Sequence, residues 1–283
     1  MPQVRLPSVA GAFYEGKAEA LKDQIKYCFL HKLGPRRIPK VNEAGPRRII
    51  GLICPHAGYE YSGPVAANAY YELALDGKPD TVVILGPNHR GYGSPLATAH
   101  EGFWRTPLGE VEVDGETAKA IVHESRLVDI DHFAHLEEHS IEVQLPFLQY
   151  LYGSEFKFAP ICFQIQDLAS AVEVGKALAA VLASENAVVI ASSDMTHYEP
   201  QRNAVAKDTA ALKAAEAMDE KRFYSSIEKQ NVTACGYGPI AALIVAAKGL
   251  GAKEAELLCY KTSGDITGDY SSVVGYAALC FKK

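Results

Sequence analysis

The stretch TVVILGPNH, residues 81–89, holds the pattern that decides the fold. Its first five residues are apolar or β-branched and predict a buried strand, and Gly86 and Pro87 predict a turn just before His89. The same order of strand, turn and histidine recurs in RRIIGLICPHAGY (47–59) and in NAVVIASSDMTH (186–197). The sequence therefore predicts three buried strands, each followed by a histidine: His56, His89 and His197.

Strands and helices alternate along the rest of the chain. We predict strands at 48–54, 81–85, 156–162, 187–191, 255–261 and 272–281, a β excursion at 94–113, and helices at 15–32, 63–75, 114–125, 137–151, 167–184, 201–217, 219–229 and 237–248. Such alternation requires crossover connections, which favour a mainly parallel sheet with helices on both faces. With no convincing linker in 283 residues, we expect one three-layer α/β domain over residues 1–283.

Composition excludes several classes of protein. The chain is 48% hydrophobic and 22% charged, which is typical of a globular protein with a large core. A net charge of −6 argues against binding to a nucleic-acid backbone. The longest apolar run, IAALIVAA at 240–247, is too short to span a membrane, and the first residues lack the apolar stretch of a signal peptide. We therefore expect a cytoplasmic protein that binds neither nucleic acid nor membrane.

The cysteines predict reduced thiols rather than disulfides. The six cysteines include no C-x-x-C pair, which argues against a zinc ribbon or a thioredoxin-like motif. Five of them fall in apolar strands or in a helix, where a thiol packs as a small hydrophobic group: Cys28, Cys54, Cys162, Cys259 and Cys280. Cys235 differs, because it lies in the glycine-rich stretch TACGYGP.

Ligands usually bind at the carboxyl ends of parallel strands, where the three histidines should meet in one crevice. A single histidine at a strand end more often bonds a loop carbonyl, but three of nine histidines share this position. Imidazole and thiolate are common metal ligands, and Cys235 precedes a predicted helix whose N-terminus favours the thiolate. Two alternatives stay open for Cys235: a nucleophile activated by a histidine, or an ordinary loop cysteine.

A second cluster is HFAHLEEHSIEVQLPFL, residues 132–148. We expect Glu137 and Glu138 in the first turn of a helix, where negative charge is favourable. His139 and Glu142, three residues apart, should share a face of that helix and contribute to the wall of the pocket. We expect His132 and His135 to be exposed loop histidines.

The stretch SSDMTH adds Asp194 to the same rim as His197. A carboxylate beside a histidine can fix its tautomer or act as a base. Ser192 and Ser193 lack the G-x-S-x-G context of a serine hydrolase, and the glycine turns GYGSP and CGYGP lack the spacing of a phosphate loop.

Taken together, these motifs resemble the Memo family. The matching stretches are PHAGYEYSG, ILGPNH, FWRTPLG, EHSIEVQLPFL, ASSDMTHY, CGYGPI and YSSVVGYAAL, and the similarity runs from AGAFYEG almost to the C-terminus. The resemblance implies a single α/β domain similar to the LigB-type class III extradiol dioxygenases. It also implies a pocket in which His56, His89 and Cys235 bind iron(II), or alternatively copper, with Asp194 and His197 as catalytic pocket residues.

The chain departs from the dioxygenases in its third ligand. Those enzymes hold iron(II) with two histidines and a carboxylate, whereas the matching position here is Cys235, an oxidisable thiol. The resemblance to Memo therefore does not carry catechol cleavage with it. The pocket wall should also include Phe13, where animal Memo proteins have Trp, and the positions Tyr59, His139 and Glu142.

Two classes of function follow from the resemblance. One is a metal-dependent redox or oxygenase-like protein of unknown substrate in which His197 transfers protons. The other is a binding module that captures a peptide or protein partner without turnover, as animal Memo proteins do with a receptor phosphotyrosine peptide. Microbial relatives occur with an AMMECR-type protein and a radical-SAM enzyme, which implies a functional association with such partners.

Overall fold

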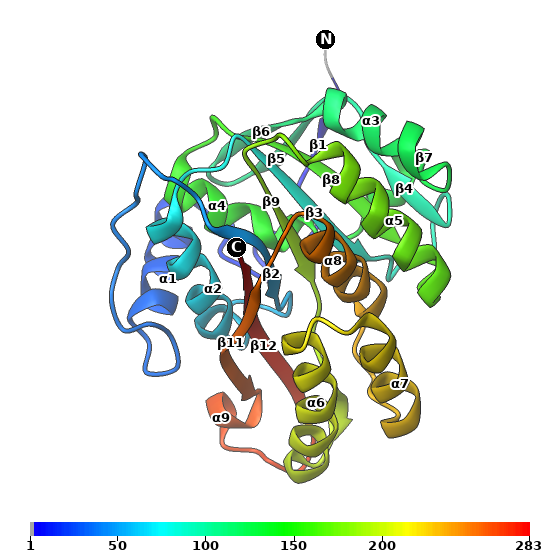
Figure 1. Cartoon of the computed structure of the whole chain (residues 1–283). Helices are drawn as coiled ribbons and strands as arrows, with labels where there is room; N and C mark the ends of the chain where they lie inside the picture. Colours follow the sequence, from blue (N-terminus) through cyan, green and yellow to red (C-terminus); the bar gives the residue numbers. More distant parts are fainter. Residues whose placement is uncertain (1–2) are drawn as a thin grey trace.

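The computed structural model describes residues 3–283 and contains one 12-stranded sheet (Figure 1). Five strands form its parallel centre in the order β6 (Gly109–Val113), β8 (Lys157–Phe163), β3 (Thr81–Pro87), β9 (Ala187–Ser192) and β2 (Ile49–Cys54). Antiparallel partners extend the centre on both sides. Beyond β2 lie β12 (Val273–Lys282), β11 (Glu254–Thr262) and β10 (His197–Glu199), and near β6 and β8 lie β5 (Phe103–Thr106) and β4 (Leu96–Thr98). Two further strands, β1 (Val4–Arg5) and β7 (Asp129–Ile130), pair with β5 and β4.

Helices cover both faces of the sheet, as Figure 1 shows. One face carries α1 (Ala18–Leu30), α2 (Gly63–Asp76) and α4 (Leu145–Tyr152), and the other carries α3 (Gly115–Ser125), α5 (Leu168–Val181), α6 (Gln201–Glu216), α7 (Glu220–Gln230) and α8 (Tyr237–Gly249). Strand β3 supplies both cores, because alternate side chains of a strand point to opposite faces. Val82 and Ile84 pack in one core, while Val83 and Leu85 pack in the other. The predicted α/β fold is confirmed.

The predicted helix at 137–151 is wrong in its first half. The structure has a 3₁₀ turn, η2 (Glu142–Gln144), followed by α4, and residues 137–139 are irregular. The buried carboxylate of Glu138 accepts the backbone N–H of Ser140 at 2.8 Å. Such a local bond between side chain and backbone competes with helix formation. Glu137 and Glu138 therefore lie in a loop rather than in a first helical turn.

Gly86 and Pro87 also differ from their predicted role, because both belong to β3 and the chain turns only after them. A side chain at residue 86 would collide with the Ser140 hydroxyl and would come within 2.8 Å of Ile141. Glycine is needed here for close approach rather than for a turn. As a result, the 138–141 loop packs directly on the end of the central strand.

Two further observations bear on the class of protein. No helix within residues 3–283 has both the length and the apolar character that a bilayer crossing requires. All six cysteines are free thiols. Strands β2, β3 and β9 are parallel neighbours in the sheet, so their carboxyl ends at Cys54, Pro87 and Ser192 lie side by side at one edge of the sheet.

Candidate metal centre

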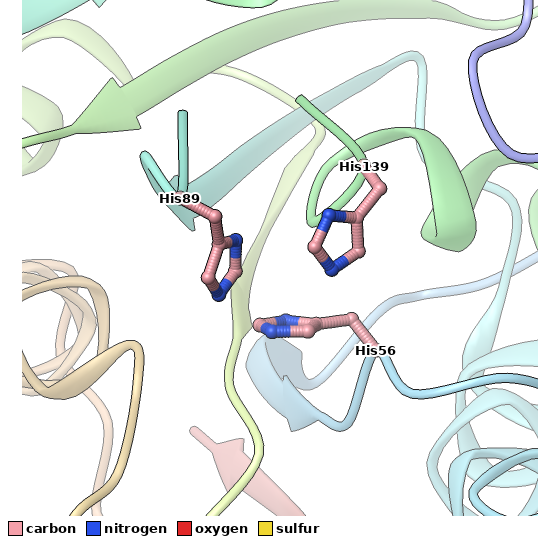
Figure 2. A group of neighbouring side chains, drawn as sticks. All are labelled: His56, His89 and His139. Atoms are coloured by element: carbon pink, nitrogen blue, oxygen red, sulfur yellow. The ribbon is translucent and has the colours of Figure 1, made fainter. Parts of the chain in front are cut away.

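Three imidazoles meet at the carboxyl ends of β2 and β3. His56 and His89 follow these strands, and their ring centroids lie 5.2 Å apart. His139, from the loop before η2, completes the group at 5.5 Å from His56 and 4.6 Å from His89. One ring nitrogen of each residue lies within 4.8 Å of the other two, and Figure 2 shows the rings facing a common centre.

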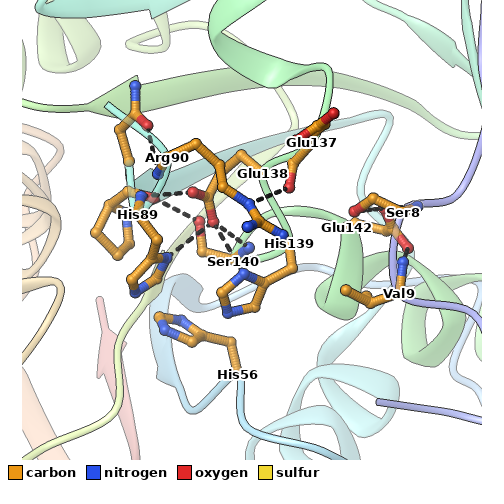
Figure 3. A network of polar contacts seen from close by, with 12 residues as sticks. Ser8, Val9, His56, His89, Arg90, Glu137, Glu138, His139, Ser140 and Glu142 are labelled. Atoms are coloured by element: carbon orange, nitrogen blue, oxygen red, sulfur yellow. Dashed lines mark hydrogen bonds and ion pairs between the residues drawn. The ribbon is translucent and has the colours of Figure 1, made fainter. Parts of the chain in front are cut away.

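The ring of His89 is held by a buried carboxylate. His89 Nδ1 donates to Glu138 Oε1 at 2.9 Å, and the other oxygen of Glu138 accepts the His89 backbone N–H (Figure 3). With Nδ1 protonated, His89 Nε2 keeps a free lone pair. Metal-binding histidines in proteins are commonly oriented in this way, by a carboxylate on the second ring nitrogen.

The tautomer of His56 follows from the hydrogen bonds of Ser192. The Ser192 hydroxyl donates its single proton to the Ser140 carbonyl at 2.6 Å and accepts an N–H of Gln144 at 2.7 Å. Its 2.8 Å contact with His56 Nδ1 must therefore be one in which His56 donates. His56 Nε2 is consequently unprotonated and available as a ligand.

Burial keeps the rings of His56 and His139 neutral. Burial, followed by the neighbouring His139, His89 and His197, lowers the pKa of His56 well below its usual value. Burial likewise lowers the pKa of His139 to about 4. Burial alone would raise the pKa of Glu138, but the hydrogen bond from His89, favourable electrostatic interactions with His89 and His139, and the N–H of Ser140 lower it to about 2. Glu138 is thus an anionic acceptor for His89, and His56 and His139 are in the neutral form that binds metals.

Cys235 approaches His56 from the start of α8. Its Sγ lies 3.1 Å from His56 Nε2 and accepts the backbone N–H of Asp194 at 3.3 Å. The thiol lies outside the group of nitrogens that are within 4.8 Å of one another. Burial raises its pKa, with a further contribution from the charge of Asp194, so the free protein holds a neutral thiol despite the helix N-terminus. Metal binding would have to displace this proton.

Of the two predicted catalytic residues, Asp194 contacts the loop that carries His56, whereas His197 begins strand β10. Asp194 is buried, and its Oδ1 accepts the backbone N–H groups of His56 at 2.9 Å and Ala57 at 3.3 Å, so it fixes the loop that carries His56. Burial raises the pKa of Asp194. His197 is half-buried, and its Nδ1 donates to the Thr233 carbonyl at 2.9 Å. His197 Nε2 is thereby left as a proton acceptor.

The predicted wall residues have different contacts. The ring of Phe13 packs edge-on against His139, with centroids 4.8 Å apart. Tyr59 is buried, and its hydroxyl donates to the Val143 carbonyl at 2.7 Å. Glu142 is fully buried and turned toward the N-terminal segment, where its carboxylate accepts five hydrogen bonds from Arg5, Ser8, Val9 and Tyr14. Phe13 therefore borders the histidines, whereas Tyr59 and Glu142 hold the loops around them.

The expectation of an exposed loop is wrong for His135, which is 1% exposed and sits in a 3₁₀ turn, η1 (Phe133–His135). Its neighbour His132 is half-buried. The role of Glu138 was not predicted from the sequence. Two acidic residues precede His139, and nothing in the sequence distinguishes the buried Glu138 from the exposed Glu137.

The donor set fits a transition metal. His56 and His89 each present an unprotonated Nε2, since their other nitrogens donate to Ser192 and Glu138. His89 is 31% exposed, so an ion can reach the centre from solvent. Imidazole suits iron, copper, nickel and zinc, and the nearby thiol would shift the preference toward the softer of these ions.

Comparisons with known proteins give concordant matches. A family model described as "Memo-like protein" matches residues 5–280. Two relatives, both MEMO1 family proteins, come from Methanopyrus kandleri and Methanothermobacter thermautotrophicus. The first is 53% identical over 281 residues and covers 99% of each chain, and the second is 51% identical and covers 98% of this chain and 99% of its own. A crystal structure of an uncharacterized protein from Escherichia coli K12 has a TM-score of 0.54 at 14% identity, covering 82% of this chain and 99% of that one, which is a likeness of fold.

Proposed function

Because this chain belongs to the Memo-like family, we propose that it is a metal-dependent redox protein whose metal is bound by His56 and His89, which follow strands, and by His139 from the loop before η2. Cys235 is proposed as a further donor, in line with the resemblance described above. The observation that carries the proposal is that three imidazoles each place a ring nitrogen within 4.8 Å of the other two, and that His89 and His56 keep an unprotonated Nε2 because their Nδ1 atoms donate to Glu138 and Ser192.

Iron(II) or copper bound here would supply one-electron chemistry toward oxygen or an organic substrate. Residues of the chain around the metal would accept a proton, hold the loop that carries His56 and cover one side of the site. His197 Nε2 can accept a proton, because Nδ1 is committed to Thr233. Asp194 holds the His56 loop through two backbone N–H groups, and Phe13 covers one side of His139.

The test is anaerobic reconstitution with iron(II), and separately with copper(I), followed by metal counting and measurement of oxygen consumption. We expect about one metal per chain in the parent protein and substantial loss in a His56→Ala variant. Oxygen consumption that depends on the metal would support redox function. Failure of both metals to bind would overturn the proposal.

The alternative is a non-catalytic binding module that would use the same pocket. A second measurement distinguishes it from a metal-dependent redox protein. A phosphotyrosine peptide would be titrated with and without a chelator. Binding in the micromolar range that ignores the chelator, without metal-dependent oxygen consumption, would favour peptide capture. The association with AMMECR-type and radical-SAM partners also stays a prediction.

A further inference from the structure

A cavity of about 190 Å³ adjoins the metal centre on the side of Phe13. Phe13 lines this cavity and also packs against His139, and Tyr61 forms another part of the wall. The charged residues of the lining are two exposed glutamates, Glu15 and Glu60, and neither has an ion-pair partner within residues 3–283. The cavity is therefore negative and bordered by aromatic rings, a combination that favours a cation.

One carboxylate oxygen of Asp194 is free to bind such a cation. Oδ1 accepts the backbone N–H groups of His56 and Ala57, whereas Oδ2 has no hydrogen bond within the described part of the chain. Asp194 is 5% exposed, and its contacts there include no lysine or arginine. A buried carboxylate without a counter-charge is costly, so its free oxygen is suited to a positively charged partner.

The hydroxyl of Tyr276 is a second free group close to Asp194. Tyr276 is 2% exposed, and among residues 3–283 its hydroxyl has no hydrogen-bond partner. Burial raises the pKa of Tyr276, and the charge of Asp194 makes the next largest contribution, followed by Tyr61 and Tyr198. These side chains are therefore neighbours, and Tyr61 connects them with the cavity.

Both free oxygens can be reached by a ligand. Over residues 3–283, the unpartnered side-chain nitrogens that are closed to solvent belong to Arg47, His100 and His135, and no side-chain oxygen is in this state. Asp194 Oδ2 and the Tyr276 hydroxyl therefore keep accessible surface on which a hydrogen bond can form.

The free groups select a ligand that donates hydrogen bonds. An ionised Asp194 and the Nε2 of His197 can only accept, and the Tyr276 hydroxyl can accept as well. Tyr198 adds an exposed aromatic face, because a β-bulge between His197 and Glu199 places it at a φ of 58° with its ring 5.7 Å from that of His197. A protonated amine combines three N–H donors with a positive charge that aromatic faces attract.

We propose that the substrate of the metal site carries a protonated primary amine, which bonds Asp194 Oδ2 and the Tyr276 hydroxyl while its apolar part lies against Tyr61. This inference rests on the proposed function, since it names the class of substrate for the same site. Amine binding is therefore measured in the metal-free protein, and metal uptake is counted separately. Metal uptake without amine binding would overturn this inference alone, whereas amine binding without metal uptake would overturn only the metal-dependent function.

The probes are n-butylamine, 1-butanol and butyrate, because they are similar in size and differ in charge. At neutral pH the amine is protonated. The full chain is titrated with each probe in the presence of a chelator, while NMR follows the ring signals of Tyr61, Tyr198 and Tyr276. Assignment of the Tyr276 signal uses a Tyr276→Phe variant.

We expect the parent protein to bind butylammonium about tenfold more tightly than 1-butanol, because charge-assisted hydrogen bonds are the stronger ones, and to bind butyrate more weakly than either. Asp194→Asn keeps an oxygen for the N–H groups of His56 and Ala57 but removes the charge, so butylammonium should fall to the affinity of 1-butanol. Tyr276→Phe keeps the ring and should also weaken butylammonium binding. The exposed Asp129→Asn is the control and should change neither affinity.

Three results would overturn the proposal: equal affinities of the parent protein for butylammonium and 1-butanol, tighter binding of butyrate, or no shift of any of these tyrosine signals with butylammonium. The comparison of probes on the parent protein decides the matter even if Asp194→Asn fails to fold.

Discussion

His89 Nδ1 donates to Glu138 Oε1 at 2.9 Å, while the backbone N–H of His89 donates to the other oxygen of the same carboxylate. The two bonds fix both the ring and the peptide of His89, and they join the loop after β3 to the loop before η2. Glu138 also accepts the N–H of Ser140. The ring of His89, a proposed metal ligand, is thus already oriented in the metal-free protein.

The first prediction concerns this carboxylate. In Glu138→Gln, the amide nitrogen would face one of the three N–H groups that the carboxylate now accepts, so His89 should lose its orientation. We expect metal affinity to fall about 10- to 100-fold, the usual effect of removing such a partner. Competition with a metal indicator measures it. The exposed neighbour Glu137→Gln is the control, and equal affinities in the two variants would contradict the orienting role.

The second prediction concerns the ligands themselves. His89→Ala should keep the fold, because the core contacts of β3 come from residues 82–85, but it should bind little metal, since affinity depends on the complete ligand set. Metal counting after anaerobic reconstitution, with circular dichroism as the check on folding, tests this. Equal metal content in the parent and His89→Ala would remove the main support for a metal site.

The third prediction separates the two further donors. His139→Ala and Cys235→Ser should both reduce bound metal, because one removes an imidazole and the other replaces a potential thiolate by a neutral hydroxyl. The same metal counts apply, with the exposed His123→Ala as the control. Full metal content in either variant would exclude that residue from the ligand set.

The fourth prediction concerns His197. His197→Ala should retain most of the metal, because its ring lies outside the group of three imidazoles and is bonded to Thr233. Any proton-transfer step should be lost, so metal-dependent oxygen consumption should fall while the metal count does not. Loss of the metal itself would show that His197 is a ligand rather than a proton carrier.

Much of this arrangement could be predicted from the sequence, because buried strands leave a strong apolar signal and the turn residues mark their ends. The positions after β2 and β3 therefore pointed to His56 and His89. The path of residues 132–141 could not be predicted in the same way. Its conformation depends on Glu138 and Ser140 contacting the end of β3, and these contacts join residues about fifty positions apart. Local periodicity predicted a helix there, and the tertiary hydrogen bonds of Glu138 prevail over it.

The fifth prediction concerns the buried ion pair between Arg5 and Glu142, whose side chains are 7% and 0% exposed. Arg5→Met should lower the free energy of unfolding by about 3–5 kcal/mol, because it leaves a buried carboxylate without its counter-charge. Denaturant unfolding measures the change. Lys22→Met, which breaks the exposed pair with Glu19, should change stability by less than about 1 kcal/mol. Similar effects of the two substitutions would contradict this account.

The place of β2 in the sheet has a consequence for biosynthesis. All six residues of β2 are buried, yet its two neighbours are β9, which begins at Ala187, and β12, which begins at Val273 near the end of the 283-residue chain. At ordinary rates of translation, β2 leaves the ribosome on the order of tens of seconds before its last partner is made. During that interval an apolar strand with open edges is exposed to pairing with other chains. A nascent polypeptide halted before Val273 should therefore depend on chaperones far more than the finished protein does, and the loop that carries His56 should be among the last parts of the molecule to become ordered.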